Sequence, residues 1–362
     1  MRVGVDTGGT FTDVVTDDGR VRKVPSTPHD PAVGVAEGLG DERPATLAHG
    51  TTVATNALLE RRGARIALVT NAGFADVIEI ARQDRPSLYD LWADRPVPLV
   101  PRELRFEVGG RLDGNGREVE PFDPASLPSL PDDVEHVAVC LLHADLNPTH
   151  EKAVAAVLRE RGPAVTLSSD VSPEFREYER TVTTVIDAYL RPACSPYLSA
   201  LEGLADEVLV MTSAGGLVPV AQGAERPASL LLSGPAGGVR AAAAAALAAG
   251  FPDAVTFDMG GTSTDVCLVL NGVPAPAAQR SVAGFPVRLP SLDVHTIGAG
   301  GGSIASVDPG GALVVGPRSA GAVPGPACYG RGGMQPTVTD ADLLLGRIPH
   351  DAVLPDLGGL DV

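Results

Sequence analysis

The sequence predicts an α/β protein made of two related domains that face each other across a cleft. Three observations lead to this prediction. Strand-like and helix-like segments alternate along the chain, the stretch VGVDTGGTFTD occupies residues 3–13, and the stretch VTFDMGGTSTDVCLVLNG repeats its pattern at residues 255–272. Two glycine turns with matching threonines and aspartates are hard to attribute to chance, so the repeat indicates duplicated architecture.

The first domain is expected at residues 1–85. Apolar residues alternate between turn residues in its first part, and further along they recur at helical spacing. The expected strands are Val3–Val5, Phe11–Thr16, Val21–Val24, Thr46–Gly50 and ARIALVT at 64–70, and the expected helices are 30–39, 52–62 before Gly63, and FADVIEIAR at 74–82. This alternation is typical of an α/β domain.

Residues 86–230 are expected to form an inserted and connecting α/β region. Proline and glycine are frequent between Pro86 and Pro131, which indicates a peripheral segment rather than a sheet core. The expected elements that follow are a buried strand at 136–143, a helix at 149–161 that Thr149 can cap, and a long amphipathic helix at 174–190.

The second domain is expected at residues 231–362. Its first stretch, SGPAGGVRAAAAAALAAG at 233–250, predicts a glycine-rich loop followed by an alanine-rich helix that ends at Gly250. The second copy of the glycine turn comes directly afterwards.

Composition excludes several functions. The chain has 362 residues, 28 Lys+Arg and 45 Asp+Glu, and a formal net charge of −17, which gives no electrostatic reason to bind nucleic acid or an anionic membrane. The four cysteines are far apart and lack the spacing of a zinc site or disulfide framework, so buried thiols are expected. The chain shows no signal peptide and no apolar run of about 18 residues, and a cytoplasmic protein is expected.

The two glycine turns have the chemistry of a phosphate-binding site. Glycine allows close backbone approach, and threonine hydroxyls and amide N–H groups donate to anions. Two such turns facing one another suit a nucleotide triphosphate, with aspartates that bind Mg²⁺ or orient a nucleophile. A plain β-hairpin explains one glycine pair equally well, but it does not explain two with matching threonines and aspartates.

The individual residues take the following roles in this interpretation. Asp6 and Asp258 follow buried strands and are assigned to Mg²⁺ and to catalysis. Asp13 and Asp265 are expected to brace their own hairpins. The phosphate contacts are expected at Gly8, Gly9, Thr10, Thr12, Gly260, Gly261, Thr262 and Thr264.

Gly237 and Gly238 are further candidates for anion binding. They precede the expected alanine-rich helix, whose N-terminus offers free N–H groups and partial positive charge. Close packing between helices explains the same small residues, and both interpretations remain open.

Four residues are candidates for a metal or proton-transfer site. Asp293 and His295 stand two positions apart in LDVHTIGAGGGS, so in a strand they share one face. His143 and His49 each end an expected strand. A structural, hydrogen-bonded histidine is the alternative at each position.

The paired D-x-G-G-T-x-T-D turns resemble the phosphate motifs of the actin, Hsp70 and sugar kinase superfold. Their wording is similar to that of one branch, the hydantoinase A and 5-oxoprolinase family. Further matching segments, in the family's order, are HGTTVATNALLERRGARIALVTNAGFADVIEIARQ, VSPEFREYERTVTTVIDAYLRP, LSGPAGGVRAA and DVHTIGAGGGSIASVDPGGALVVGPRSAGAVPGPACYGRGG. The resemblance implies two ribonuclease H-like, actin-like ATPase domains with an inserted α/β region.

The resemblance also implies ATP-dependent hydrolysis of a cyclic amide such as a hydantoin or 5-oxoproline. ATP and Mg²⁺ are the implied cofactors, with a second divalent metal as a further candidate. Full-length family members continue for several hundred residues and carry a Gly-Gly-Ala-Gly-Pro adenosine segment, so the second domain is expected to be incomplete here. The implied partner is a hydantoinase B-like subunit. Two alternatives are open for the missing half: a second polypeptide supplies it, or the chain is a shortened relative with altered nucleotide use.

Two other classes of function remain open. A carboxylase subunit that acts on a ketone, or a small-molecule kinase, shares the superfold and the phosphate chemistry. A nucleotide-binding regulatory subunit needs the turns for binding alone. Covalent catalysis is not indicated, because no Ser-His-Asp arrangement or reactive cysteine stands out.

Overall fold

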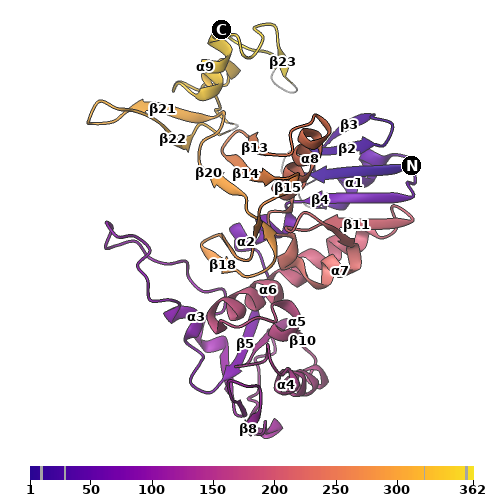
Figure 1. Cartoon of the computed structure of the whole chain (residues 1–362), viewed down its shortest axis with the longest axis vertical. Coiled ribbons are helices and arrows are strands. Elements are labelled where there is room, and N and C mark those ends of the chain that lie inside the picture. The colour runs from indigo at the N-terminus through magenta and orange to yellow at the C-terminus, as the bar shows by residue number, and fades with distance from the viewer. Residues whose placement is uncertain (9–10, 28–29, 322, 355–357) are drawn as a thin grey trace. The chain divides into compact units, whose positions relative to one another are not determined.

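The computed structural model describes residues 1–8, 11–27, 30–321, 323–354 and 358–362, and it divides into two compact units (Figure 1). Unit 1 contains Met1–Gly237 and Pro276–Leu292, and unit 2 contains Gly238–Ala275 and Asp293–Val362. The return of the chain to unit 1 at 276–292 is a feature that the sequence pattern does not reveal. The separation of residues 1–85 from 86–230 stays a prediction.

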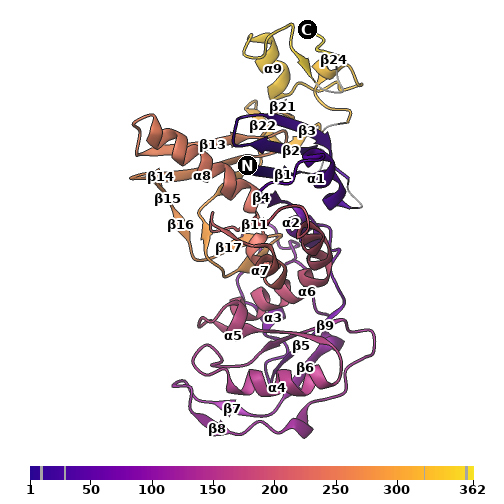
Figure 2. The same cartoon turned by 90° about the vertical axis from the view of Figure 1, so that its right-hand side faces the viewer.

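The first sheet of unit 1 carries the first glycine turn. Its order is β12-β11-β4-β1-β2-β3 (Figure 2). The strands are β1 (Arg2–Thr7), β2 (Phe11–Thr16), β3 (Val21–Pro25), β4 (Thr46–Thr51), β11 (Glu207–Met211) and β12 (Leu217–Pro219). Strand β4 runs parallel to β1 and to β11. Because parallel strands end at one sheet edge, the residues that follow these three strands lie along the same edge.

Short helices pack on this sheet: α1 (Pro31–Leu39), α2 (Val53–Leu59) and α7 (Val220–Glu225). The start of α1 is fixed by Asp30, whose side chain accepts a hydrogen bond from the Ala32 N–H at 3.2 Å. Gly38 lets α1 approach the sheet, because a Cβ there would lie 2.6 Å from Val14 Cγ2. Helix α1 is therefore seated directly beside the hairpin that carries the first turn.

The second sheet of unit 1 is entirely parallel. Its order is β10-β9-β5-β6, with β5 (Ile66–Asn71), β6 (Arg105–Val108), β9 (His136–Cys140) and β10 (Ala164–Leu167). Strands β5 and β9 are buried along their whole length, as their continuous apolar sequences require. Helices α3 (Val77–Ile80), α4 (Thr149–Glu160) and α5 (Ser168–Val171) belong to this part, and the hairpin β7 (Arg111–Leu112)–β8 (Glu118–Glu120) lies at its periphery.

One long helix, α6 (Glu177–Leu201), joins the two sheets of unit 1. It contacts β9 and β5 of the second sheet, and α1 and α2 of the first. Its fully buried Arg180 donates to Asp145 Oδ1 at 2.6 Å and to the Leu141 carbonyl at 2.7 Å. These bonds compensate for burying the cation.

Unit 2 carries the second glycine turn. Its main sheet is formed by β13 (Ala254–Met259), β14 (Thr264–Leu270), β15 (Val273–Pro274) and β20 (His295–Ile297), and β14 is the strand that the other three pair with. The hairpin β21 (Ser303–Val307)–β22 (Leu313–Ser319) and helix α9 (Val338–Leu344) follow, and α9 begins with a capping box of Thr337 and Asp340. The last pair is β23 (Val353–Leu354)–β24 (Gly358–Gly359).

Two local predictions are wrong. The SGPAGG segment is not a loop, because α8 (Ser233–Ala248) begins at Ser233 and includes these glycines. Thr149 does not cap α4; it is the first helical residue, and its own N–H donates to Asn147 Oδ1 at 3.1 Å. Helices α2 and α3 are also shorter than their apolar spacing predicts, ending at Leu59 and Ile80.

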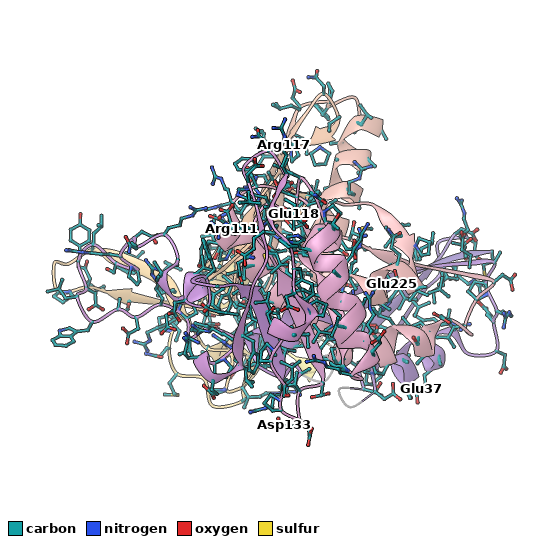
Figure 3. The ribbon with its side chains drawn as sticks, turned by 90° about the horizontal axis from the view of Figure 1, so that it is seen from below. Glu37, Arg111, Arg117, Glu118, Asp133 and Glu225 are labelled. Carbon is teal, nitrogen blue, oxygen red and sulfur yellow. The ribbon has the colours of Figure 1, made fainter. Side chains whose placement is uncertain are left out.

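Acidic residues lie on the outer surface, in agreement with the excess of Asp and Glu over Lys and Arg in the sequence. Glu37, Asp133 and Glu225 are exposed, and Figure 3 shows them on different elements. All four cysteines are buried and free, as expected. Within the described ranges, the model contains no helix whose length and apolar character would let it cross a membrane.

Candidate active site

The first turn places Asp6 next to the end of β1. Asp6 pairs with Asp13 of β2 and with Gly50 of β4, and its side chain is exposed. Partial burial of the carboxylate and the nearby negative charge of Asp13 raise the pKa of Asp6. Gly50 makes room for this carboxylate, because a Cβ at position 50 would lie 2.9 Å from Asp6 Oδ1.

Hydrogen bonds between side-chain hydroxyl groups support the first turn. The Thr12 hydroxyl is fully buried, 3.5 Å from Thr7 Oγ1 and 3.3 Å from Ser26 Oγ. Ser26 Oγ in turn donates to the Gly8 carbonyl at 2.8 Å. The structure therefore gives the Thr12 hydroxyl internal partners, and its contact with phosphate stays a prediction. Gly9 and Thr10, the other expected phosphate contacts of this turn, lie outside the described residues.

The second turn has the same pairing in unit 2. Asp258 is exposed and pairs with Asp265, as Asp6 pairs with Asp13. Gly260, Gly261 and Thr262 are also exposed, and the Gly260 N–H donates to the Ser263 carbonyl at 2.9 Å. The Thr264 hydroxyl is buried and donates to the Ala299 carbonyl at 2.5 Å, so it too has an internal partner.

A third glycine segment holds the second turn in place. The Gly301 and Gly302 N–H groups donate to the Gly260 and Gly261 carbonyls at 2.9 and 2.7 Å. A Cβ at Gly300 would lie 2.7 Å from backbone atoms of the turn, including the Gly260 carbonyl oxygen and the Thr262 nitrogen. Spacing alone does not predict that the GAGGG segment at 298–302 supports the second turn, because the two segments are distant in sequence.

The second aspartate of each turn braces its hairpin. Asp13 forms an ion pair with Lys23 Nζ at 2.9 Å, and Asp265 Oδ1 accepts from Thr296 Oγ1 at 2.6 Å. Both partners lie on the adjacent strand. Because Asp13 and Asp265 are bound to side chains of the adjacent strands, Asp6 and Asp258 remain as the accessible carboxylates.

Helix α8 contributes Gly238 beside the second turn. A Cβ at Gly238 would lie 3.7 Å from Asp258 Oδ2, which is ordinary contact distance. Gly237 and Gly238 are the fifth and sixth residues of α8, so their N–H groups are not at the free N-terminus that the anion-binding prediction requires. Their contact with a nucleotide stays a prediction.

The four metal candidates have different surroundings. His49 is fully buried, contacts the Tyr197 hydroxyl through Nε2, and has its pKa lowered to about 4 by burial. His143 occupies a turn with φ +60°. Asp293 and His295 are exposed two positions apart. Throughout the described ranges, no group of three His, Cys, Asp or Glu side chains is arranged to hold a metal ion.

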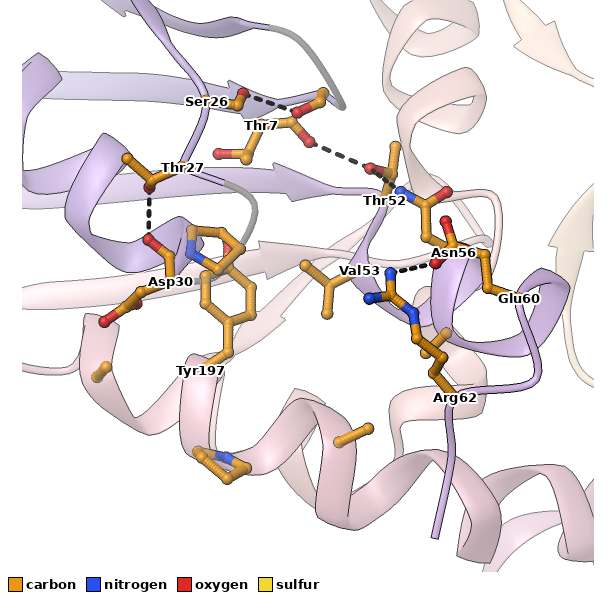
Figure 4. Close-up of a pocket in the computed structure, with 16 residues that line it drawn as sticks. Thr7, Ser26, Thr27, Asp30, Thr52, Val53, Asn56, Glu60, Arg62 and Tyr197 are labelled. Atoms are coloured by element: carbon orange, nitrogen blue, oxygen red, sulfur yellow. Dashed lines mark hydrogen bonds and ion pairs between the residues drawn. The ribbon is translucent and has the colours of Figure 1, made fainter.

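A pocket of about 600 Å³ in unit 1 opens beside the first turn (Figure 4). Thr7 lines it, whereas Asp6 is not among its lining residues, as expected for neighbours that alternate in a strand. Asn56 Nδ2 donates to Thr52 Oγ1 at 3.2 Å, and Thr52 Oγ1 donates to the Thr7 carbonyl at 3.4 Å. This chain of bonds connects the pocket wall to the end of β1.

The fold and the two turns define the class: a mixed α/β protein of the hydantoinase type, with two strand–turn–strand motifs that present one aspartate each. The chain belongs to the hydantoinase/oxoprolinase family. The Hydantoinase/oxoprolinase family model matches residues 180–360, and the model of the family's N-terminal region matches residues 2–162.

Individual relatives cover nearly the whole chain. The caprolactamase subunit alpha of Pseudomonas jessenii is 39% identical over 98% of this chain and 55% of its own length. The acetophenone carboxylase gamma subunit of Aromatoleum aromaticum is 37% identical over 96% of this chain and 53% of its own. The crystal structure of the ATP-dependent caprolactamase from Pseudomonas jessenii has a TM-score of 0.88 and 37% identity over 100% of this chain and 57% of that one. The chain thus spans about half the length of these relatives.

Replacement of Gly300 by alanine is expected to disturb the second turn. The new Cβ would collide with backbone atoms that cannot rotate away, so the free energy of unfolding of unit 2 should fall by about 1–3 kcal/mol. Amide hydrogen exchange at Gly301 and Gly302 should accelerate. Gly298→Ala is the control, because a Cβ there meets only Pro317 Cβ at 3.7 Å. Equal exchange rates in the two variants would contradict the role assigned to the glycine segment.

Stability should fall between pH 6.5 and pH 4 because of His49. Its pKa is about 4 in the folded chain and 6.5 as the ordinary value, so the unfolded state binds the proton more tightly. The contribution is complete above pH 6.5 and decreases by about 3 kcal/mol on reaching pH 4. Denaturant titrations of His49→Gln should show a shallower loss over this range than the parent chain. His295→Gln, at an exposed position, should retain the parental slope; an unchanged slope in His49→Gln would refute the assignment.

Proposed function

We propose that this chain is the ATP-using component of an enzyme that opens a cyclic amide. The observation that carries the proposal is the duplicated turn, in which Asp6 and Asp258 occupy matching positions and keep accessible carboxylates. The relationship to a caprolactamase subunit supports the cyclic amide as substrate class. Hydantoins and 5-oxoproline belong to the same class.

The need for ATP follows from amide chemistry. A lactam carbonyl is a poor electrophile, and its nitrogen is a poor leaving group. Attack of the amide oxygen on the terminal phosphorus of ATP forms an O–P bond and releases ADP. Water then adds to the activated carbon, and the C–N bond breaks to release the amine and leave an acyl phosphate. A second water attacks the acyl carbon, so a carboxylate forms and inorganic phosphate leaves with the former amide oxygen. Phosphoryl transfer requires mainly positioning and charge neutralisation from a protein.

The two turns carry carboxylates suited to Mg²⁺ and N–H and hydroxyl groups suited to the phosphates of ATP. Asp6 and Asp258 supply the oxygen ligands that Mg²⁺ prefers, and bound Mg²⁺ would neutralise phosphate charge. Exposed N–H groups of Gly260 and Gly261 and the Thr262 hydroxyl are suited to phosphate oxygens. Asp293 and His295 would hold a second divalent ion only with ligands from elsewhere.

The proposed enzyme includes more polypeptide than this chain. The relatives are about twice as long, and the names of two of them describe subunits. We expect a hydantoinase B-like subunit that resolves the activated intermediate, further sequence that corresponds to the rest of the relatives' length, and action in the cytoplasm.

A carboxylase subunit is the second candidate. The relationship to the acetophenone carboxylase gamma subunit favours it, because the two relatives are similarly close to this chain. The two candidates share phosphoryl transfer from ATP and differ in the acceptor. Supplying the assembled enzyme with a lactam, or with a ketone and bicarbonate, and following ADP release distinguishes them.

Replacement of Asp6 or Asp258 by asparagine is expected to lower substrate-dependent ATP turnover by about 100-fold or more, because each loses a carboxylate needed during phosphoryl transfer. ATP turnover of the purified assembly is the measurement. Asp13→Asn is the matched control, since Asp13 is bound to Lys23, and it should change turnover little. Retained turnover in both principal variants would favour the regulatory function instead.

Replacement of Gly50 by alanine should displace the Asp6 carboxylate without unfolding the sheet. We expect about a tenfold loss of ATP turnover at unchanged thermal stability, because misplacing a catalytic group is costly. Gly4→Ala is the control on the same strand as Asp6, where a Cβ meets only the Val15 carbonyl at 3.9 Å. If both variants turn over ATP alike, Gly50 does not position Asp6.

A further inference from the structure

A second pocket in unit 1 shares no lining residue with the pocket beside the first turn. Its volume is about 680 Å³, and its walls come from residues 78–98, the start of α6, and the hairpin β17 (Arg280–Val282)–β18 (Phe285–Val287). Gly284, with φ +79°, lets the hairpin pack against residues 78–98, because a Cβ there would lie 2.5 Å from Pro96 Cγ. The pocket is thus a defined feature of unit 1.

Two of the arginines in the pocket wall are neutralised by carboxylates. Arg82 forms two hydrogen bonds with the Glu179 carboxylate, one of them 2.9 Å from Nε to Oε1. Arg95 pairs with Asp84 at 2.9 Å. Both cations are therefore committed to the protein itself.

Arg280 is the exception. Its side chain is half-buried, and its one hydrogen bond runs from Nη2 to the Leu231 carbonyl. Across the described ranges, no carboxylate lies within ion-pair distance of this guanidinium, and burial lowers the pKa of Arg280 to about 10. A guanidinium has five N–H donors, and withdrawing it from water without a counter-charge is costly.

We infer that this pocket is a binding site for a small carboxylate, with Arg280 as the residue that holds the carboxylate group. Guanidinium and carboxylate form paired, parallel hydrogen bonds, which would give the half-buried charge of Arg280 a partner of opposite sign. The pocket is separate from the first turn, so this site goes beyond the proposed function.

The other charges in the wall favour a single carboxylate over a polyphosphate. Glu79, Asp84, Asp94 and Glu179 also line the pocket. Asp94 is exposed and forms no ion pair within the described part of the chain. Repulsion from these groups opposes a ligand of high negative charge, whereas an amino acid brings an ammonium group that they attract.

Fluorescence and calorimetry can test the site with the chain itself. Trp92 is the only tryptophan in the sequence, and it belongs to the segment between Pro86 and Arg95, two residues that line the pocket. The probe is 6-aminohexanoate, titrated without ATP so that catalysis plays no part. We expect saturable binding in the millimolar range, seen as heat and as a change in Trp92 emission. Inorganic phosphate and ATP should not compete.

Two comparisons identify the carboxylate contact. The carboxamide analogue, 6-aminohexanamide, should bind the parent chain at least about tenfold more weakly, because it loses the charged hydrogen bonds. Arg280→Gln should weaken 6-aminohexanoate by a similar factor, and Arg280→Lys should recover part of the loss. Arg117→Gln is the control, since Arg117, which is labelled in Figure 3, is not among the residues that line the pocket.

Three outcomes would overturn the inference. Absence of saturable binding, equal affinity for the acid and the amide, or equal affinity of the parent chain and Arg280→Gln would each contradict it. Because the acid–amide comparison uses the parent chain, the test stands even if Arg280→Gln fails to fold. Retained ATP turnover in both Asp6→Asn and Asp258→Asn would count against the proposed function but not against this site.

Discussion

The shape of the second turn depends on a contact between two glycine segments of unit 2. Gly301 and Gly302 bind the carbonyls of Gly260 and Gly261, and Gly300 lies where a Cβ would meet backbone. With its carbonyls held by these bonds, the turn can leave Gly260, Gly261 and Thr262 exposed. Asp258, at the end of β13, is then presented beside a turn of fixed shape.

The first turn is supported by different contacts from those that support the second turn. The buried hydroxyl of Thr12 and the half-buried hydroxyl of Ser26 support it, and the Ser26 hydroxyl donates to the Gly8 carbonyl. Gly50 then leaves space for the Asp6 carboxylate. Both turns keep one aspartate accessible and commit the other to an adjacent strand. The shared result, reached with different supports, is an accessible carboxylate at the matching position of each turn.

Much of this arrangement is predictable from the sequence, and the remainder has physical causes. The strands of both hairpins follow from alternation, and the repeat identifies Asp6 and Asp258 as equivalent. Helix α8 begins earlier than the sequence predicts, because glycines usually destabilise helices, yet here Gly237 and Gly238 lie inside one. Gly50, Gly300 and Arg280 could not be assigned beforehand, since their roles come from contacts with residues distant in sequence.

Following the amide oxygen with an isotope tests directly whether ATP phosphorylates that oxygen before the ring opens. The assembled enzyme would be given a lactam carrying ¹⁸O in its carbonyl group, and the released inorganic phosphate would be analysed by mass spectrometry. If the chain promotes phosphorylation of the amide oxygen, one ¹⁸O atom should appear in each phosphate. Unlabelled phosphate, with all ¹⁸O kept in the ring-opened carboxylate, would contradict the account.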